Sequence, residues 1–190
     1  MPDPVPDSAV AQPPLRAPER LTAGSPAYRR TSLAMFVGGF ATFALLYATQ
    51  PLLPQLADDF ALGAARSSLA VSSGTAAMAV LLIPASVLSD RFGRERLMKV
   101  SLALAAAVSI ASAAVTDFTQ LLVLRALLGV VLAGLPAAAM AYLSEEVAPD
   151  AQGRAVGLYI GGNALGGMSG RFLAAVITEW ASWRWALGAV

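Results

Sequence analysis

A short charged segment separates two long apolar stretches near the middle of the chain, and this contrast limits the fold more than any other feature. The segment reads Ser86-Val-Leu-Ser-Asp-Arg-Phe-Gly-Arg-Glu-Arg96, with a mainly apolar stretch on each side. An α-helix of about 20 apolar residues spans the hydrocarbon core of a bilayer. The pattern therefore predicts two transmembrane helices joined by a short connection in water.

Composition places the whole chain in the same class. Of its 190 residues, 57% are hydrophobic and only 13% are charged, which is unlike a soluble domain. The chain has no Cys and no His, which removes thiolate and imidazole nucleophiles and the usual zinc and haem ligands. We therefore expect an all-α membrane protein without a metal or cofactor. Nothing in the composition supports nucleic-acid binding.

The chain divides into two predicted regions. Residues 1–30 hold seven of the twelve prolines and few large apolar side chains, and they predict a disordered cytoplasmic N-terminal tail. Residues 31–190 predict a transmembrane half-domain. Its expected spans are about 33–56, 68–88, 97–115, 120–143 and 154–177, followed by an incomplete sixth span at 183–190.

Lys and Arg are distributed unequally between the two ends of these spans. With the N-terminus inside, nine of them fall on the inner side, and only Arg66 and Arg184 fall on the outer side. Cytoplasmic connections of multi-pass proteins carry an excess of Lys and Arg. The bias therefore predicts a cytoplasmic N-terminus.

The charged segment contains the residue types that a tight connection between antiparallel helices needs. Gly93 allows a positive φ, and Asp90 can accept hydrogen bonds from Arg91 or Arg94. A basic connection of this kind also serves as an anchor to anionic headgroups, and its charge alone does not separate the two roles.

The order of these residues resembles a family signature. Ser86-x-Leu-Ser-Asp-Arg-x-Gly-Arg-x-Arg96 is similar to the loop between helices two and three of the major facilitator superfamily, with Ser86 in place of a glycine and Glu95 in place of a base. The resemblance implies a gate at the inner side. Its expected residues are Asp90, Arg91, Gly93, Arg94 and Arg96. Because the inner end of the fourth span lies near this connection in the predicted topology, we expect Arg94 to pair with Glu145 or Glu146 there.

An arginine lies within the predicted fourth span. Arg125 heads a strip of small residues, Arg125-x-x-x-Gly129-x-x-x-Ala133, that allows a neighbouring helix to approach closely. A charge at the bilayer centre costs about 2.5 kcal/mol or more, so a paired or functional Arg125 is favoured over one that snorkels to the interface. The strip resembles the fourth-helix motif of the superfamily, which implies a role in proton coupling.

Glycine is concentrated in the predicted fifth span, on two opposite stripes. Gly153, Gly157 and Gly161 form one stripe, and Gly162, Gly166 and Gly170 form the other. Generic close packing of helices on both sides is one explanation. The spacing of Gly153, Gly162, Asn163, Gly166 and Gly167 also resembles the fifth-helix motif of antiporters in the superfamily, with Asn163 in place of proline. That resemblance implies export rather than uptake.

A stripe of aromatic and polar side chains follows the predicted first span. Phe36, Phe40, Phe43, Tyr47 and Gln50 recur at intervals of three and four residues, so they share one helix face. The stripe either packs against lipid and neighbouring helices or lines a substrate cavity, and its polar end favours the cavity.

Asn163 and Arg171 in the predicted fifth span are further candidates for the substrate cavity. Arg125 and Arg171 both lack an acidic partner within the spans. We therefore expect their counter-charges to come from other sequence, from an anionic group of the substrate or from water.

Together the resemblances cover about residues 30–190. They are those of the N-terminal six-helix half of a twelve-helix major facilitator transporter, similar to bacterial drug/proton antiporters or arabinose-efflux-like inner-membrane permeases. They imply proton-driven efflux of a small organic molecule by alternating access, with the proton gradient as the energy source. The expected partners are a small-molecule substrate, the lipid bilayer and a missing C-terminal six-helix half, in a bacterial inner membrane.

Two other interpretations compete with this one. A truncated half-transporter without independent transport activity, acting only as a membrane interaction partner, also fits an incomplete sixth span. A membrane enzyme is disfavoured, because acids, His and Cys are missing from the middle of the spans.

Overall fold

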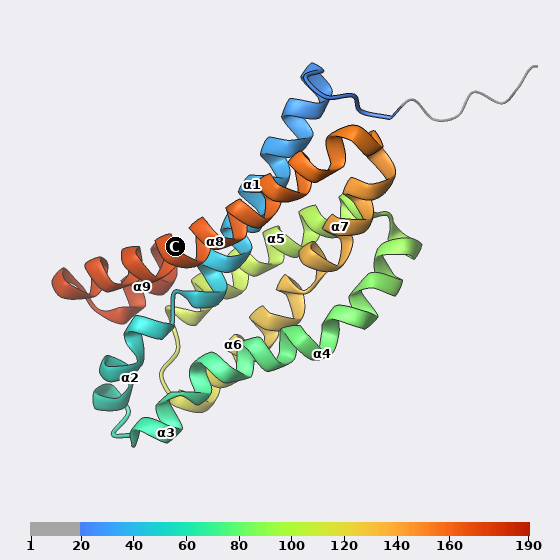
Figure 1. Ribbon diagram of the computed structural model, residues 1–190. Coiled ribbons are helices and arrows are strands. Elements are labelled where there is room, and N and C mark those ends of the chain that lie inside the picture. Colours follow the sequence, from blue (N-terminus) through green and yellow to red (C-terminus); the bar gives the residue numbers. More distant parts are fainter. Residues whose placement is uncertain (1–19) are drawn as a thin grey trace, which may run out of the picture.

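The computed structural model describes residues 20–190, and within that range the chain is a bundle of helices (Figure 1). The elements are α1 (Pro26–Tyr47), the 3₁₀ helix η1 (Gln50–Leu52), α2 (Leu53–Asp59), α3 (Ala64–Ser67), α4 (Leu69–Phe92), α5 (Arg94–Ser112), α6 (Phe118–Leu132), α7 (Gly134–Glu146), α8 (Pro149–Trp180) and α9 (Trp183–Ala189). The predicted all-α fold is confirmed.

Each predicted span overlaps one or more helices of the structure. α4, α5 and α8 correspond to the second, third and fifth spans, and α9 begins where the sixth was expected. Within residues 20–190, three stretches are long and apolar enough on their own to cross a membrane: Pro26–Asp59, Ala64–Phe92 and Phe118–Glu146. α5 and α8 have lower mean hydropathy, because α5 begins with several charged residues and α8 is rich in glycine.

Prolines interrupt the first and fourth spans. α1 ends at Tyr47, and the chain continues through Pro51 and Pro54 as η1 and α2. The fourth span divides into α6 and α7, because Pro136 has no N–H to donate to the carbonyl of Leu132 one turn earlier. Carbonyls that lose their helical partners at such breaks are free to accept hydrogen bonds from side chains of other helices.

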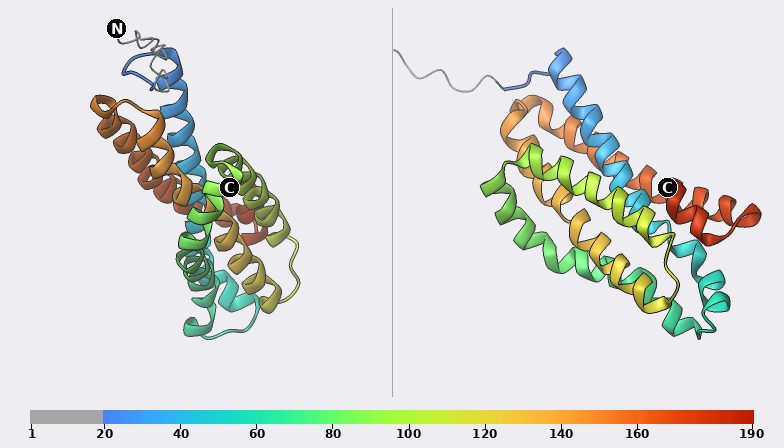
Figure 2. Two further views of the ribbon diagram at one scale, coloured as in Figure 1. Left: turned by 90° about the vertical axis from the view of Figure 1, so that its right-hand side faces the viewer. Right: turned by 180° about the vertical axis from the view of Figure 1, so that it is seen from behind.

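The helices run back and forth and pack in pairs (Figures 1 and 2). α1 lies beside α8, α4 beside α6, and α5 beside both α6 and α7. We call the end with the start of α1 and the α4–α5 and α7–α8 connections the inner end, because the sequence predicts it to be cytoplasmic. The outer end holds α2, α3 and the start of α9. Buried apolar clusters around Leu143, Leu128 and Leu56 fill the bundle.

The N-terminal boundary differs from the prediction at residue 30. α1 already begins at Pro26, and Ser25 caps it by accepting a hydrogen bond of 3.2 Å from a first-turn N–H. Before the cap, Leu21 forms a β-bridge beside Val147 through backbone hydrogen bonds of 2.7 and 3.0 Å. The predicted disordered tail is therefore wrong for residues 20–30, and residues 1–19 lie outside the described range.

Close contact between α1 and α8 depends on one glycine stripe. A Cβ at Gly162, Gly166 or Gly170 would collide with main-chain atoms of α1. The opposite stripe, Gly153, Gly157 and Gly161, has no atom within 4 Å of any of its Cβ positions. The predicted close contact is therefore confirmed for the stripe of Gly162, Gly166 and Gly170. Within residues 20–190, the opposite stripe of α8 is open.

Replacing Gly166 by Ala is expected to destabilise the α1–α8 pair, because the new Cβ meets main-chain atoms of Phe40 that cannot rotate away. Overpacking of this kind costs about 1–3 kcal/mol. Gly161→Ala is a matched change in the same helix that places its Cβ in open space and gains helix propensity. Thermal unfolding in detergent should show a lower midpoint for Gly166→Ala only. Equal midpoints for the two variants would contradict this assignment of the contact face.

Candidate functional site

The charged segment forms the α4–α5 connection at the inner end. α4 ends at Phe92 and α5 begins at Arg94, so a single residue joins two antiparallel helices. That residue, Gly93, adopts a φ of 86°, the positive value that the sequence predicts. A residue with a Cβ would be strained there. The tight connection brings Asp90, near the end of α4, next to Arg94 at the start of α5.

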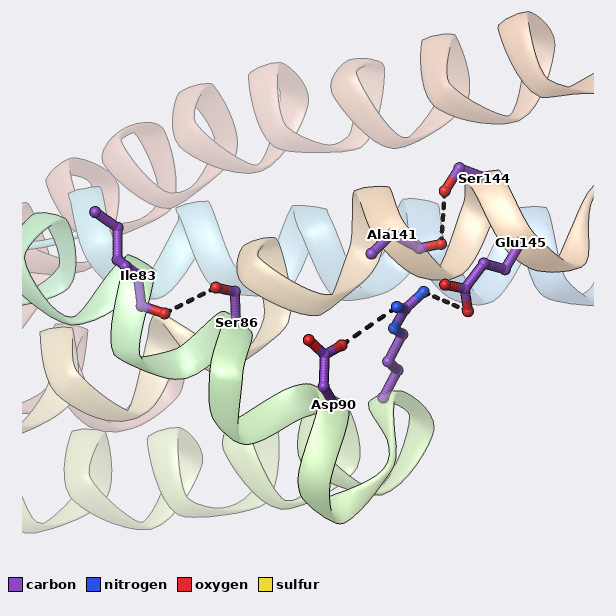
Figure 3. A network of polar contacts seen from close by, with 7 residues as sticks. Ile83, Ser86, Asp90, Ala141, Ser144 and Glu145 are labelled. Atoms are coloured by element: carbon purple, nitrogen blue, oxygen red, sulfur yellow. Dashed lines mark hydrogen bonds and ion pairs between the residues drawn. The ribbon is translucent and has the colours of Figure 1, made fainter.

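Arg94 connects this turn to the end of α7. Its Nη2 donates to Oδ1 of Asp90 at 3.3 Å, and its Nη1 lies 2.5 Å from Oε2 of Glu145. Figure 3 shows Asp90 and Glu145 on either side of the guanidinium group. Of the two glutamates predicted as partners, the structure pairs Arg94 with Glu145. Glu146 forms no ion pair within residues 20–190.

A cleft of about 880 Å³ surrounds this pair. Its charged lining residues are Asp90, Arg94, Glu95, Arg96, Lys99, Glu145 and Glu146. Arg91 is exposed at the end of α4 and does not line the cleft. Lys99 donates to Glu95 at 2.5 Å, and this hydrogen bond together with the positive charge lowers the pKa of the Glu95 carboxyl. Glu95, which stands in place of a base of the family signature, is thus balanced by the positive charge of Lys99.

Arg125 is buried in the middle of the bundle, with 1% of its surface exposed. Its nitrogens donate to three main-chain carbonyls: Nε to Ala70 at 3.3 Å, Nη1 to Leu45 at 3.3 Å and Nη2 to Leu46 at 2.7 Å. Leu45 and Leu46 lie in the last turn of α1, where carbonyls lack helical partners and the helix dipole is negative. The guanidinium group therefore joins α1, α4 and α6 without a carboxylate.

These contacts decide between the interpretations of Arg125. The side chain points into the bundle and does not snorkel to the interface. Carbonyls at a helix end provide the partners that were expected from other sequence, a substrate or water. Beside it, a Cβ on Gly129 would collide with the carbonyl of Gly74, so α4 and α6 touch through their backbones. The close approach predicted for the small-residue strip is therefore confirmed at Gly129.

A second polar group lies toward the outer end, where α8 meets α1. The Cζ atom of Arg171 is 4.4 Å from the ring centroid of Tyr47, and its Nε donates to Oε1 of Gln50 at 2.6 Å. Gly167 leaves room for the ring, since a Cβ there would be 3.1 Å from it. Arg171 is exposed and forms no ion pair within the described residues. We call Tyr47, Gln50 and Arg171 the outer cluster.

Asn163 is set apart from the outer cluster. Its Oδ1 is buried against Gly39 of α1 and has no hydrogen-bond partner in the part of the chain that the structure describes. Phe36 and Phe40, from the predicted aromatic stripe, stack with ring centroids 6.5 Å apart and are half-buried beside α8. The stripe therefore divides: its phenylalanines pack beside α8, and its polar end holds Arg171.

One contact at the outer end is not predicted by the sequence. Asp59 of α2 accepts a hydrogen bond of 2.6 Å from Nε1 of Trp183 and lies 3.7 Å from Nη1 of Arg184. Arg184 also stacks on the ring of Trp183, with 4.2 Å between its Cζ and the centroid. The contact joins α2 to α9 over 124 positions of the chain. Neither periodicity nor composition indicates a pairing at such a distance.

The polar side chains thus gather at the inner end, in the centre and toward the outer end of the bundle. Within residues 20–190, no three or more His, Cys, Asp or Glu side chains are placed to hold a metal ion. The inner cleft offers ion pairs between helices, and the outer cluster offers an amide, an aromatic face and a guanidinium group. Such an arrangement suits reversible contacts between helices and the orientation of a small solute.

Several known proteins are similar in sequence to this chain. A profile of the Major Facilitator Superfamily matches residues 35–190. The inner membrane transport protein YnfM of Escherichia coli (strain K12) is 44% identical over 167 residues, covering 88% of this chain and 40% of that protein. The MFS-type transporter YybF of Bacillus subtilis (strain 168) is 41% identical over 167 residues, covering 88% and 41%. The chain thus spans about two fifths of the length of these curated relatives.

The fold is also similar to that of a solved transporter. A bacterial homologue of the human lysosomal transporter Spinster, crystallised in an inward-facing and unoccupied conformation, matches with a TM-score of 0.70 at 20% identity. The match covers 86% of this chain and 40% of that one, and at this identity it concerns the fold alone. Because the sequence profile covers most of the chain and the helices adopt the corresponding arrangement, the chain belongs to the major facilitator superfamily.

Proposed function

We propose that the chain forms the N-terminal six-helix half of a secondary active transporter that exports a small organic molecule in exchange for protons. Membership of the superfamily supports transport, and the length of the curated relatives supports a second half of similar size. The proposed location is the bacterial inner membrane, with the N-terminus in the cytoplasm. The name of YnfM and the distribution of Lys and Arg support this location and orientation.

Alternating access is the proposed mechanism. Two six-helix halves rock about a site near the middle of the bilayer, so that the site opens to one side at a time. Each closure needs contacts that can break and form again in every cycle. The observation that carries the proposal is the bridge from Asp90 through Arg94 to Glu145, which joins the α4–α5 connection to α7 in the inner cleft.

The strength of this bridge suits a reversible gate. The Asp90 and Glu145 side chains are 67% and 61% exposed, and ion pairs of partly exposed groups contribute about 0.2–1 kcal/mol each. An energy of about 1 kcal/mol shifts a two-state equilibrium about fivefold. The bridge can therefore favour one access state without making it permanent, which a transporter requires because both states are populated in each cycle.

The outer cluster is the proposed part of the substrate site in this half. Tyr47, Gln50 and Arg171 place an aromatic face, an amide and a guanidinium group together on α1 and α8. Asn163 on α8 adds a buried amide oxygen that still lacks a partner among the described residues. A few convergent polar groups on a largely apolar wall are typical of sites that orient small organic molecules.

We assign proton coupling to Arg125 and the direction of transport to the motif on α8. The Arg125 guanidinium keeps a positive charge in the interior of the bundle, and such a charge favours the ionised form of a carboxyl group that comes close. A carboxyl group of the second half would release its proton on approaching Arg125 and rebind one on moving away. Export is favoured by the antiporter-like pattern Gly153, Gly162, Asn163, Gly166 and Gly167.

Transport is tested with the complete gene product that contains these residues, reconstituted in lipid vesicles with an imposed pH difference. We expect the pH difference to drive the movement of at least one compound from a panel of radiolabelled small organic molecules. A protonophore should abolish that movement. Movement that ignores the pH difference would contradict proton coupling, and folded protein that moves no compound would contradict transport.

Reversing the charge of Arg94 is expected to slow transport about fivefold or more, because Arg94→Glu places three negative charges together at the inner cleft. Adding Glu145→Arg restores a pair of opposite charges and should recover much of the initial rate. Glu146→Arg in the Arg94→Glu background is the matched control, since Glu146 is not the observed partner. Equal rescue by the two changes would argue against the specific pair, and no rescue by either would remove the gating role.

Arg125→Gln is expected to abolish the dependence of transport on the pH difference, whereas Arg125→Lys should keep part of it because it retains the charge. Both variants lose carbonyl contacts, so both should unfold at lower temperature than the wild type. The comparison of the two variants separates the charge from the packing. Folded Arg125→Gln protein with an unchanged pH dependence would refute the coupling role.

A further inference from the structure

A pocket of about 510 Å³ lies at the inner end, between the start of α1 and the start of α8. Arg29, Ser32 and Leu33 of α1 and Arg154 and Leu158 of α8 are among its lining residues. None of these residues lines the cleft around Arg94. The pocket is therefore separate from the proposed gate.

Two guanidinium groups border this pocket without an acidic partner. Neither Arg29 nor Arg154 forms an ion pair with a carboxylate in residues 20–190, and this includes Asp150, one turn before Arg154 on α8. Two positive charges from different helices thus line one space. Because like charges repel, an anion between them would stabilise the arrangement.

Ser32 supplies a second and independent indication of a ligand. It is 4% exposed, and its Oγ has no hydrogen-bond partner in the described residues. Buried hydroxyl groups in helices commonly donate to the carbonyl one turn earlier, as Thr42 of the same helix does to Gly38 at 2.9 Å. An oxygen atom of a ligand in the pocket would satisfy the Ser32 hydroxyl.

The pocket changes from polar to apolar along the bundle axis. Arg29 and Arg154 lie near the beginnings of α1 and α8, and Leu33 and Leu158 follow one turn deeper, about 6 Å further along each helix. Both leucines are exposed, at 60% and 42%. A phospholipid at a membrane interface presents its phosphate and its first methylene groups in the same order.

We propose that this pocket binds the headgroup of an anionic phospholipid from the leaflet at the inner end. Arg29 and Arg154 contact the phosphate oxygens, Ser32 donates to one of them, and Leu33 and Leu158 contact the beginning of an acyl chain. The proposal does not depend on transport activity. Inorganic phosphate offers the same phosphate oxygens as the headgroup but has no acyl chain, so experiments can distinguish the two ligands.

Native mass spectrometry of the delipidated complete gene product, with equal amounts of phosphatidylglycerol and phosphatidylcholine added, tests the proposal. The wild type should retain phosphatidylglycerol preferentially. The double variant Arg29→Gln/Arg154→Gln should weaken that binding about 25-fold, because each basic group contributes about fivefold. Arg30→Gln is the matched control, because Arg30 follows Arg29 on α1 but lines another pocket together with Glu95. It should keep the preference.

A further variant, a folding control and a competing ligand complete the test. Ser32→Ala should weaken phosphatidylglycerol binding and leave phosphatidylcholine binding unchanged. Circular dichroism establishes that each variant is folded. An equal loss of phosphatidylglycerol binding in Arg30→Gln and in the double variant would show that positive charge anywhere at this end is sufficient. That result would overturn the site. Displacement of phosphatidylglycerol by millimolar inorganic phosphate would overturn the lipid assignment, and folded wild type without a preference would overturn the proposal.

Discussion

The contact of Arg125 with the last turn of α1 is the constraint on which the rest of the bundle depends. The interior of a membrane offers no water to satisfy a guanidinium group or a carbonyl freed at a helix end. α1 stops before Pro51, which leaves carbonyls without helical donors, and Arg125 brings donors without a carboxylate. The guanidinium nitrogens therefore donate to the carbonyls that the end of α1 leaves without helical donors. Because the same guanidinium also reaches Ala70, it fixes α1, α4 and α6 relative to one another, and the inner cleft and outer cluster are built on these helices and their neighbours.

The positions of the helices could be predicted because the thickness of the bilayer sets the length of an apolar run. The breaks at Pro51 and Pro136 follow from the missing N–H of proline, although the predicted spans passed over them. The prediction of disorder was wrong at residues 20–30. A proline-rich composition with few large apolar side chains indicates only that a segment cannot bury a core of its own. An N-cap at Ser25 and a single backbone pairing at Leu21 require no core, so composition could not detect them.

The sequence predicted the charged residues of the candidate site but not all of their partners. Which residues carry charge in or near the membrane can be read from the sequence, because such charges are costly. Their partners cannot be read in the same way. Glu145 and Glu146 are neighbours in sequence but point about 100° apart on a helix, and only the packing of α7 beside the α4–α5 connection selects Glu145. The acceptors of Arg125 are main-chain carbonyls, which every residue carries, so no pattern of residue types marks them.

Leu21 pairs with Val147, and a chain made from its N-terminus onward produces these two residues far apart in time. A ribosome that adds about 5–20 residues per second completes the stretch between them in roughly 6–25 s. During that interval Leu21 lacks its backbone partner, because α4 to α7 are still being synthesised. The backbone pairing at Leu21 therefore forms only after the first four spans have been made, and it marks the completion of the α7–α8 connection during biosynthesis.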